Sequence, residues 1–417
     1  MPRLLLCYHF FHPDDVVSAR QFVGLAQEQQ RRGWQVTVLT SNRSRQRGQT
    51  FASHERWNGI DIYRVFRPDW DQSRPATRLL NSAWMIAAWL QRTLRLERFD
   101  AIVIGSDPAF SPMLALGLRI AYPRAALVHW CFDLYPEAIE AEGGSTAVTS
   151  LVHLARRLMT VTYRAYDGIV DLGPRMRARL MEYPSNAAHE TLVPWALAEA
   201  ERAAKPDPAV RAELFGDARL GLLYSGTLGR AHEFEPFLRL ARACRARSGS
   251  AIAFCFAARG HREEELRRAV TASDSNIRFA PFADEQALQL RLEAADLHLL
   301  SLRPEWAGIV VPSKFFGSIA VGRPVLYAGP ADSEVASWIA DFDLGLNMTG
   351  NQLDAVADRL HALLADTADL VRWQENALAV YRREFSRLTV NDRWDAFLRR
   401  LVLAKRARPW PTAAKSG

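Results

Sequence analysis

Short β-rich runs alternate with helix-length amphipathic segments almost from the first residue, and this alternation constrains the fold more than any other feature. It is typical of a parallel sheet covered by helices on both faces. The expected strands lie at 4–8, 35–40, 60–66, 101–104, 126–130 and 168–171. The expected helices lie at 17–32, 78–97 and near 146–166. The first part of the chain therefore predicts a doubly wound α/β domain.

The pattern pauses over residues 196–219, which are rich in Ala, Glu and Pro, and restarts at Leu220. Further strands are expected at 220–224, 252–257, 277–279, 297–302 and 324–327, and further helices at 233–247, 262–271, 284–293 and 314–321. A chain of 417 residues that is 49% hydrophobic can form two cores, because single cores stop growing near about 250 to 300 residues. The predicted parts are an N-terminal domain at 1–195, a linker at 196–219, a second domain at 220–385, a terminal helix at 386–404 able to pack back on the first domain, and a basic, disordered tail at 405–417.

Doubly wound sheets bind ligands beyond the carboxyl ends of their strands, at the point where the strand order reverses. With two such sheets, we expect the site in a cleft between the domains.

The composition favours an anionic partner and argues against several classes of protein. The net charge is +7, but the basic residues are scattered as single arginines, unlike a nucleic-acid-binding surface. The four cysteines lack a CxxC spacing, which indicates reduced core residues of a cytosolic protein. No cleavable signal is recognised at the N-terminus, and the longest apolar run of helix 78–97 is Ala83 to Leu90, far short of the roughly 20 residues of a membrane span.

The segment VPSKFFGSIAVGRPVL places Lys314 at the start of an apolar helix, in a chain with four lysines among 53 basic residues. The other three lysines fall in the predicted linker and tail. Ser313 is placed to cap the helix, and free N–H groups of its first turn favour an anion. Lys314 with this helix terminus predicts a diphosphate anchor; the alternative is a lysine that extends into solvent.

The segment YSGTLGRAH follows the strand that ends at Tyr224. Gly226 and Gly229 allow close approach of a ligand to the backbone, and Arg230 offers a second cation. The alternative is an ordinary turn before a helix. Together with Lys314, the segment predicts a two-sided phosphate site.

In the first domain, Asp133 and Glu137 follow the strand at 126–130 and are candidates to orient an acceptor hydroxyl or accept its proton. A helix-capping Asp133 is the alternative. His9 and His12 follow the first strand and are candidates for acceptor contact or for packing. The DFD at 341–343 resembles a metal motif, but it lacks a ligand set and we reject it.

The tryptophan-bearing helix 78–97 also carries two arginines, Arg92 and Arg95. It predicts either a helix that rests on a membrane surface or a packed helix whose Trp84 and Trp89 belong to the core.

Three segments, YSGTLGRAHEFEPFL, VHWCFDLYPEAIEAEGG and the long stretch AADLHLLSLRPEWAGIVVPSKFFGSIAVGRPVLYAGPADSEVASWI, resemble family 4 glycosyltransferases of the GT-B fold. The resemblance is strongest to the branch found in bacterial capsule, O-antigen and colanic acid clusters, and it covers nearly the whole chain. It implies two Rossmann-like domains that face each other across a cleft. It also implies transfer of a sugar from a nucleotide diphosphate donor with retained configuration, without a metal and with no cofactor besides that co-substrate.

Carried onto this chain, the resemblance implies that Arg230 and Lys314 hold the donor diphosphate and that Glu334 reaches a ribose or sugar hydroxyl. The broad family carries two glutamates where this chain has Ile309 and Gly317, so Glu305 or Glu334 is expected to substitute. The implied donor-binding residues are Ser225, Gly226, Thr227, Gly229, Arg230, His232, Glu305, Ser313, Lys314 and Glu334. The implied acceptor-binding residues are His9, His12 and Asp133, and the implied catalytic residues are Asp133, Glu137, Arg230 and Lys314.

The sequence therefore predicts a cytoplasmic hexosyltransferase of cell-surface polysaccharide biosynthesis that acts on a glycan or polyprenyl-linked acceptor, with a peripheral membrane contact left open. Its alternatives are a non-catalytic nucleotide-sugar-binding subunit, an epimerase or inverting transferase of the same fold, and a transferase that acts on small molecules.

Overall fold

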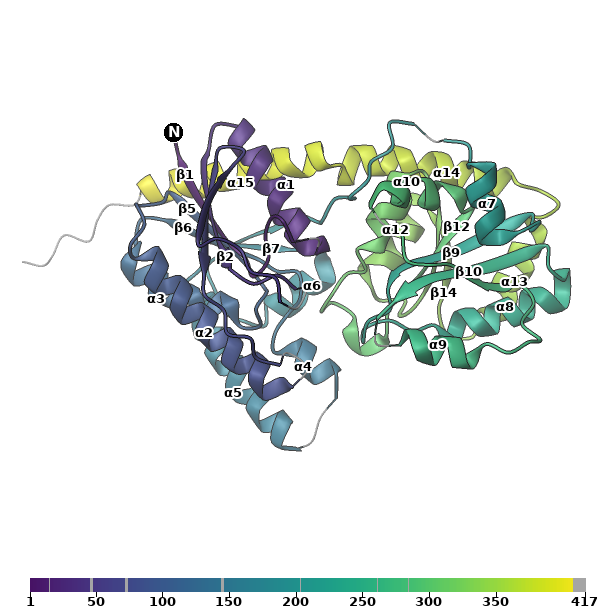
Figure 1. The fold of residues 1–417 in the computed structure, drawn as a ribbon, viewed down its shortest axis with the longest axis horizontal. Coiled ribbons are helices and arrows are strands. Elements are labelled where there is room, and N and C mark those ends of the chain that lie inside the picture. Colours follow the sequence, from purple (N-terminus) through teal and green to yellow (C-terminus); the bar gives the residue numbers. More distant parts are fainter. Residues whose placement is uncertain are drawn as a thin grey trace, which may run out of the picture. The chain divides into compact units, whose positions relative to one another are not determined.

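A computed structural model of the chain describes residues 1–14, 16–45, 48–71, 74–143, 146–202, 204–260, 262–283 and 285–407. The chain divides into two compact units (Figure 1). The first unit comprises Met1–Leu172, Arg177–Leu192 and Asn391–Gly417, and the second comprises Gly173–Met176 and Val193–Val390. Residues 408–417 of the predicted tail lie outside the described residues.

The first unit is built on an eight-stranded sheet in the order β3-β4-β2-β1-β5-β6-β7-β8. All pairs are parallel except β3 with β4. The strands are β1 (Arg3–Cys7), β2 (Gln35–Ser41), β3 (His54–Trp57), β4 (Ile60–Val65), β5 (Ala101–Gly105), β6 (Ala126–Trp130), β7 (Gly168–Asp171) and β8 (Ala188–Thr191). The order of connection reverses between β1 and β5, the two central strands.

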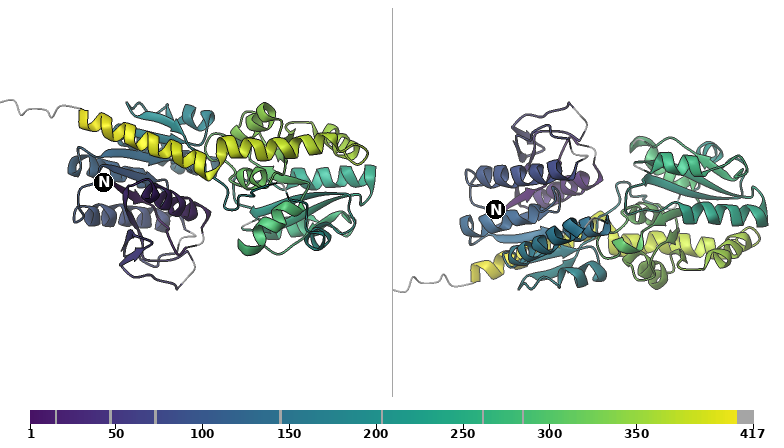
Figure 2. Two further views of the ribbon diagram at one scale, coloured as in Figure 1. Left: turned by 90° about the horizontal axis from the view of Figure 1, so that it is seen from above. Right: turned by 90° about the horizontal axis from the view of Figure 1, so that it is seen from below.

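Helices cover both faces of this sheet, as Figure 2 shows from above and below. On one face lie α1 (Val17–Arg31) and α15 (Arg387–Ala407). Gln29 of α1 donates a hydrogen bond to the carbonyl of Asn391 in α15, and the indole of Trp34, just after α1, donates to Asp395 over 2.7 Å. On the other face lie α2 (Pro75–Thr93), α3 (Leu114–Ala121) and α5 (Thr146–Tyr163), with the 3₁₀ turn η1 (Ser111–Met113) in contact with all three. The shorter α4 (Glu137–Ala141) and α6 (Pro174–Leu180) complete the elements.

The second unit holds a six-stranded, all-parallel sheet in the order β11-β10-β9-β12-β13-β14. In chain order within the unit this is 3-2-1-4-5-6, the arrangement of dinucleotide-binding folds, and it reverses between β9 and β12. The strands are β9 (Leu220–Thr227), β10 (Ile252–Arg259), β11 (Ile277–Phe279), β12 (Leu297–Ser301), β13 (Val325–Ala328) and β14 (Gly345–Met348).

The helices of the second unit alternate with its strands as far as β14, and the remaining helices follow that strand. They are α7 (Pro208–Phe215), α8 (Glu235–Ser248), α9 (Glu263–Ala269), α10 (Glu285–Ala294), η2 (Pro304–Trp306), α11 (Lys314–Ala320), α12 (Glu334–Phe342), α13 (Leu353–Ala362), α14 (Ala368–Val380) and the π-helical turn η3 (Tyr381–Phe385).

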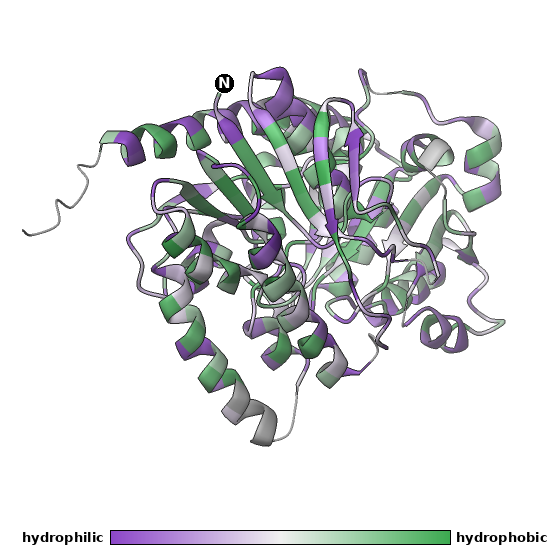
Figure 3. Cartoon of the chain, turned by 60° about the vertical axis from the view of Figure 1, so that its left-hand side comes forward, coloured by the Kyte–Doolittle hydropathy of each residue, from purple (hydrophilic) through white to green (hydrophobic). Residues whose placement is uncertain are grey.

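Apolar side chains of the central strands fill the interior of each unit, and green stretches accordingly recur along the strands in Figure 3. All four cysteines are buried and unpaired, as the sequence predicts.

Three strands were not predicted from the sequence, namely β3, β8 and β14. Each is four residues long and lies at an edge of its sheet, so it lacks the buried apolar run that marks a central strand. Strand β9 also runs three residues beyond Tyr224, because Ser225, Gly226 and Thr227 pair with β10. These residues therefore belong to the strand and not to a turn.

Two segments are more ordered than expected. The predicted linker contains α7, whose N-terminus is capped because the Asp207 carboxylate accepts hydrogen bonds from the N–H groups of Ala209 and Val210. The last helix continues to Ala407, and Lys405 lies in it, 2.8 Å from the carboxylate of Asp167. Lys314 is thus not the one lysine in a folded segment.

The cap of α7 yields a stability prediction. Asp207→Ala is expected to lower the free energy of unfolding by about 1 kcal/mol, because two backbone N–H groups lose their acceptor. Asp207→Ser keeps a capping oxygen and should stay within a few tenths of a kcal/mol of the wild type. Urea denaturation followed by circular dichroism measures both; equal losses would show that the cap contributes nothing.

Candidate functional site

The ammonium of Lys314 lies at the reversal of the second sheet, where β9 and β12 both end. Its Nζ is 3.2 Å from Nε2 of His232, in the loop that follows β9. The other ring nitrogen of His232, Nδ1, is 2.7 Å from the carbonyl oxygen of Ser301, the last residue of β12. The three residues therefore form a chain of hydrogen bonds across the reversal point.

The direction of each bond in this chain follows from its chemistry. A carbonyl oxygen only accepts, so Nδ1 of His232 carries the proton and donates it to Ser301. Nε2 is then an acceptor, and the Lys314 ammonium donates to it. Burial and the neighbouring charge of Lys314 lower the pKa of His232 to about 3, so the ring stays neutral near pH 7. The neutral ring can hold the ammonium without repelling it.

The stem of Lys314 passes over Gly226, and its ammonium lies 5.2 Å from the centroid of the Tyr224 ring. A Cβ on Gly226 would come within 2.5 Å of Cε of Lys314, and Gly226 has a φ of +138°. The stem of the lysine therefore fills space that a Cβ at this position would occupy. Burial lowers the pKa of Lys314 to about 8, because the ammonium loses part of its hydration.

Further bonds fix the loop that carries His232. The hydroxyl of Ser301 accepts from the N–H of Glu233 and donates to its carbonyl, and the N–H of Arg303 donates to the carbonyl of Ala231. The guanidinium of Arg262 donates to the carbonyl of His232. The loops after β9 and β12 are thus tied to each other, which fixes the ring that holds Lys314.

The start of α11 offers fewer anion-binding groups than predicted. The Ser313 side chain makes no capping bond and is exposed. The N–H groups of Phe315 and Phe316 donate to the carbonyls of Pro312 and Ser313, so they are occupied within the turn. The positive charge here therefore comes mainly from the side chain of Lys314.

The remaining predicted donor residues differ in their surroundings. Thr227 and Arg230 are exposed, whereas Ser225 and Gly229 are partly buried. Glu305 is exposed, with its carboxylate 3.8 Å from Arg303. Their roles as donor ligands stay predictions.

Glu334, in contrast, is buried within the second unit. Its Oε1 accepts hydrogen bonds of 3.0 Å from the N–H groups of Arg175 and Met176. Burial raises the pKa of this carboxyl. One of the two carboxylate oxygens is thus engaged with backbone N–H groups. The sequence alone does not show that the segment Gly173–Met176 lies beside α12.

A second polar cluster lies at the reversal of the first sheet, after β1 and β5. The N–H of His9 donates to the carbonyl of Asp107, and Nδ1 of His9 is 3.2 Å from the Asp107 carboxylate. Arg67 donates to Nε2 of His9 over 2.7 Å, which places the ring proton on Nδ1. His9 is therefore held between a cation and an anion.

Asp133 belongs to the neighbourhood of this cluster. The N–H groups of Phe132 and Asp133 donate to the hydroxyl of Ser106, which precedes Asp107. Burial, and then the charge of Asp107, raise the pKa of the Asp133 carboxyl to about 6. Asp133 does not cap α4, since that helix begins at Glu137 with Pro136 in the cap position. A carboxylate with this pKa is mostly ionised near pH 7 and able to accept a proton.

Glu137 and His12 have structural partners. Glu137 is buried, its carboxylate accepts a hydrogen bond from the Tyr183 hydroxyl, and Arg156 lies 3.3 Å away. The ring of His12 stacks on Trp57 at 4.2 Å between centroids. Both residues thus have a packing role in the first unit, whatever else they do.

Sequence reasoning missed Asp107, Arg67 and Ser301 as members of these clusters. Asp107 and Ser301 had a readable signal, because each lies at or just after the end of a buried strand next to the reversal. Arg67 had none, since nothing in the sequence distinguishes it from the other arginines.

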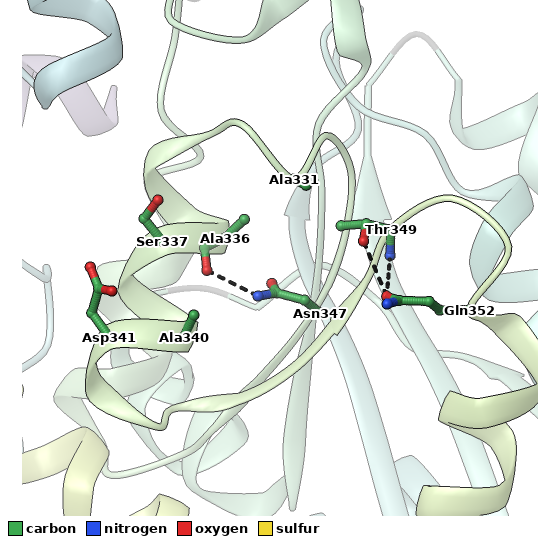
Figure 4. A pocket seen from close by; sticks show the side chains of 8 residues that line it. All are labelled: Ala331, Ala336, Ser337, Ala340, Asp341, Asn347, Thr349 and Gln352. Carbon is green, nitrogen blue, oxygen red and sulfur yellow. Dashed lines mark hydrogen bonds between the residues drawn. The ribbon is translucent and has the colours of Figure 1, made fainter.

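A separate hollow of about 400 Å³ lies beside α12 and β14 in the second unit (Figure 4). None of the predicted donor residues lines it. Asp341 of the DFD sequence does, whereas Asp343 pairs with Arg372 and accepts a bond from the Trp373 indole. Among the described residues, no group of three His, Cys, Asp or Glu side chains is arranged to hold a metal. The hollow is lined by Ala331, Ala336, Ser337, Ala340, Asp341, Asn347, Thr349 and Gln352.

Comparison with known proteins finds similarity to a sequence family in the first part of the chain. Residues 18–196 match the family described as Glycosyl transferase 4-like domain. The chain is 25% identical over 276 residues to the "Probable glycosyltransferase WbjE" of Pseudomonas aeruginosa, across 64% of this chain and 66% of that protein. The match therefore spans just under two thirds of this relative.

Solved structures with the same fold cover nearly the whole chain. A sucrose-phosphate synthase of Thermosynechococcus elongatus aligns with a TM-score of 0.73 at 14% identity, over 97% of this chain and 100% of that chain. Anabaena HepE in complex with UDP aligns with a TM-score of 0.65 at 14% identity, over 96% of this chain and 100% of that chain. An E. coli trehalose-6-phosphate protein bound with UDP-2-fluoro glucose aligns with a TM-score of 0.72 at 12% identity, over 98% of this chain and 100% of that chain. The chain has the two-domain GT-B fold of these proteins, and its residues 18–196 are similar to the glycosyl transferase 4-like domain.

The carboxylate pair of the first unit yields a prediction that needs no ligand. Asp107→Asn should lower the pKa of Asp133, because a nearby negative charge is removed, while burial should still keep it above its ordinary value. Carbon-13 NMR titration of the carboxyl groups measures this. Asp341→Asn in the second unit is the control and should leave the Asp133 titration unchanged; an unchanged titration in Asp107→Asn would contradict the coupling.

Proposed function

We propose that this protein is a glycosyltransferase that transfers a hexose-type sugar from a nucleoside diphosphate donor to a glycan or polyprenyl-linked acceptor. The observation that carries the proposal is the Lys314 ammonium, held by the neutral ring of His232 at the strand reversal of the second sheet. Ligands of such sheets bind at this point. The proposal is supported by the glycosyl transferase 4-like domain and by nucleotide-bound proteins of the same fold.

The chemistry assigned to the second unit is stabilisation of the leaving diphosphate. The bond between the anomeric carbon and the diphosphate oxygen breaks, and negative charge develops on that oxygen. An ammonium already fixed by His232 meets this charge with little rearrangement, which is the most effective form of electrostatic catalysis. We assign Lys314 this role, with Arg230 as the second cation of the proposal.

The acceptor is assigned to the cluster of the first unit. Its hydroxyl oxygen forms the new bond to the anomeric carbon, and its proton passes to the departing phosphate or to Asp133. With a pKa of about 6, Asp133 is suited to orient the hydroxyl as an ionised acceptor. We further propose that the configuration is retained and that neither a metal nor another cofactor takes part, with the nucleotide sugar as co-substrate.

The setting we propose is cell-surface polysaccharide biosynthesis at the cytoplasmic face of a membrane. Among the described residues, the structure contains no helix long and apolar enough to span a bilayer. A polyprenyl-linked acceptor would then be reached from the membrane surface.

A second candidate is a subunit that binds a nucleotide sugar without turning it over. It is favoured by the two positions where the broad family carries glutamates, because Ile309 is buried here and Gly317 offers no side chain. A panel of nucleotide sugars, assayed for released nucleotide with a lipid-linked or glycan acceptor, separates the two candidates. Binding without turnover for every donor would favour the subunit.

Lys314→Ala is expected to lower turnover by about 100-fold or more, the scale of losing one preorganised electrostatic group. Lys205→Ala, the matched control, removes a lysine of the connecting segment and should stay near the wild-type rate. Steady-state release of nucleotide measures both. A Lys314→Ala rate within about threefold of the wild type would remove Lys314 from the mechanism.

The pH dependence gives an independent test of the same residue. Lys314 is charged below its pKa of about 8 and neutral above it, so the affinity for nucleoside diphosphate should fall as the pH rises through about 8. His232 and Tyr224 do not change charge in this range, because burial lowers the pKa of the first to about 3 and raises that of the second. Calorimetric titration with UDP should show this loss in the wild type and not in Lys314→Ala.

Asp133→Asn is expected to impair transfer by about 100-fold while leaving donor affinity within about twofold, the range expected for loss of a general base. The wild-type rate should rise as the pH rises through about 6, where the carboxyl loses its proton, and this rise should be absent in the variant. Rate profiles and UDP titration provide the measurements. An equal loss of binding and transfer would exclude Asp133 from the acceptor site.

A further inference from the structure

The outer face of α2 is apolar and exposed. Leu80 and Trp84 are 57% and 45% exposed, one turn apart, and Leu79 lies beside them. The rings of Phe66 and Trp70 stand edge-on to the Trp84 ring, with distances of 6.5 and 6.4 Å between ring centroids. Both of these side chains are themselves exposed. Trp89, in contrast, is fully buried in the core. The helix thus has one tryptophan in the core and one on the surface.

The outer face of α5 repeats this pattern. Leu154, Leu158 and Val161 are about half exposed and recur at helical spacing, which places them on one stripe. Arg157 and Arg164 are exposed at the neighbouring positions of the same face. Figure 3 shows hydrophobic segments recurring along the helices of this layer.

The helices α2, α3 and α5 form a single layer on one face of the first sheet, since η1 contacts all three. Their sequences contain no aspartate or glutamate, although the chain has 46 acidic residues. Two glutamates in and just after the neighbouring α4 form ion pairs with arginines of this layer. The carboxylate of Glu140 is 2.6 Å from Arg156, and that of Glu142 is 3.9 Å from Arg78. These acids cancel part of the positive charge of the layer, while Arg157 and Arg164 are exposed beside its apolar groups.

We infer that the layer of α2, α3 and α5 is a docking surface for an anionic lipid bilayer. Exposed leucines and a tryptophan ring can enter the headgroup region, and arginines beside them can meet lipid phosphates. The Trp84 indole already donates to the carbonyl of Phe66, which lets the rest of the ring enter an apolar phase without an unpaired N–H.

The surface differs from the one expected on helix 78–97. The Arg92 guanidinium packs over the Tyr63 ring of β4, 4.4 Å from its centroid. The basic groups proposed for lipid contact are Arg157 on α5 and Arg164, which directly follows that helix. The sequence suggested one amphipathic helix, whereas the structure presents a layer of three.

A bilayer fits this surface better than a protein partner. Exposed apolar residues beside exposed cations suit a surface that is apolar inside and negative at its boundary, whereas protein interfaces deplete charge from their apolar centre. The inference deepens the proposed function, in which a lipid-linked acceptor is used. The biological role of lipid binding rests on that proposed function. Lipid binding itself is measured without donor or acceptor.

The test is cosedimentation of the full-length protein with vesicles of phosphatidylcholine alone and of phosphatidylcholine with equal parts phosphatidylglycerol. We expect binding to the mixed vesicles and at least about tenfold weaker binding to the neutral ones. The variants Leu154→Gln/Leu158→Gln and Leu79→Gln/Leu80→Gln should each weaken binding to mixed vesicles by about tenfold, since each loses two inserted side chains.

The matched control is Leu290→Gln/Val371→Gln, which removes two equally exposed apolar residues from α10 and α14 of the second unit. It should bind vesicles like the wild type. Arg157→Gln/Arg164→Gln should reduce the preference for the anionic vesicles and the sensitivity of binding to salt. Circular dichroism and thermal melting confirm that each variant is folded.

Three results would overturn the inference. The first is that the wild type does not sediment with anionic vesicles. The second is that the control loses as much binding as the α5 variant. The third is that light scattering reveals a dimer that Leu154→Gln/Leu158→Gln dissociates. The last result would assign the layer to a second copy of the chain. Transferase activity with a water-soluble acceptor should be unchanged in the α5 variant, so failure here leaves the proposed function untouched.

Discussion

The hydrogen bond from the Lys314 ammonium to the neutral ring of His232 is the interaction on which the functional reading depends. It exists because the carbonyl of Ser301 fixes the ring proton on Nδ1 and leaves Nε2 free to accept. A charged imidazole at this place would repel the ammonium, and burial prevents that state. The stem of the lysine also fills the space that a Cβ on Gly226 would occupy. Three ordinary residues thereby hold one cation in a defined place.

The two sheets use the same architectural device for different chemistry. Each reverses its strand order beside its first strand, and each carries a histidine in the loop that follows that strand. In the second unit His232 accepts from a lysine; in the first, His9 accepts from Arg67 and lies against Asp107. The first cluster is acidic on balance near Asp133 and suits a hydroxyl, while the second is positive and suits a diphosphate.

Much of this could be predicted from the sequence. The alternation of strands and helices predicts both sheets, and the scarcity of lysine draws attention to Lys314. The prediction was wrong where an element lacks a buried apolar run, as in β3, β8 and β14, and where capping chemistry inside a presumed linker forms α7. It was also wrong about the cap on α11, because a serine before a helix can leave its hydroxyl unused.

The sequence by itself determined the fold class, the two repeated sheets and the strand ends at which polar side chains would gather, because hydrophobic periodicity is local and is written along the chain. Only the tertiary structure decided which of those side chains meet. The contact of Lys314 with His232, the engagement of Glu334 with the backbone of Arg175, and the shared surface of α2, α3 and α5 join residues far apart in sequence. Such pairings depend on strand order and on the paths of loops, which no local pattern records.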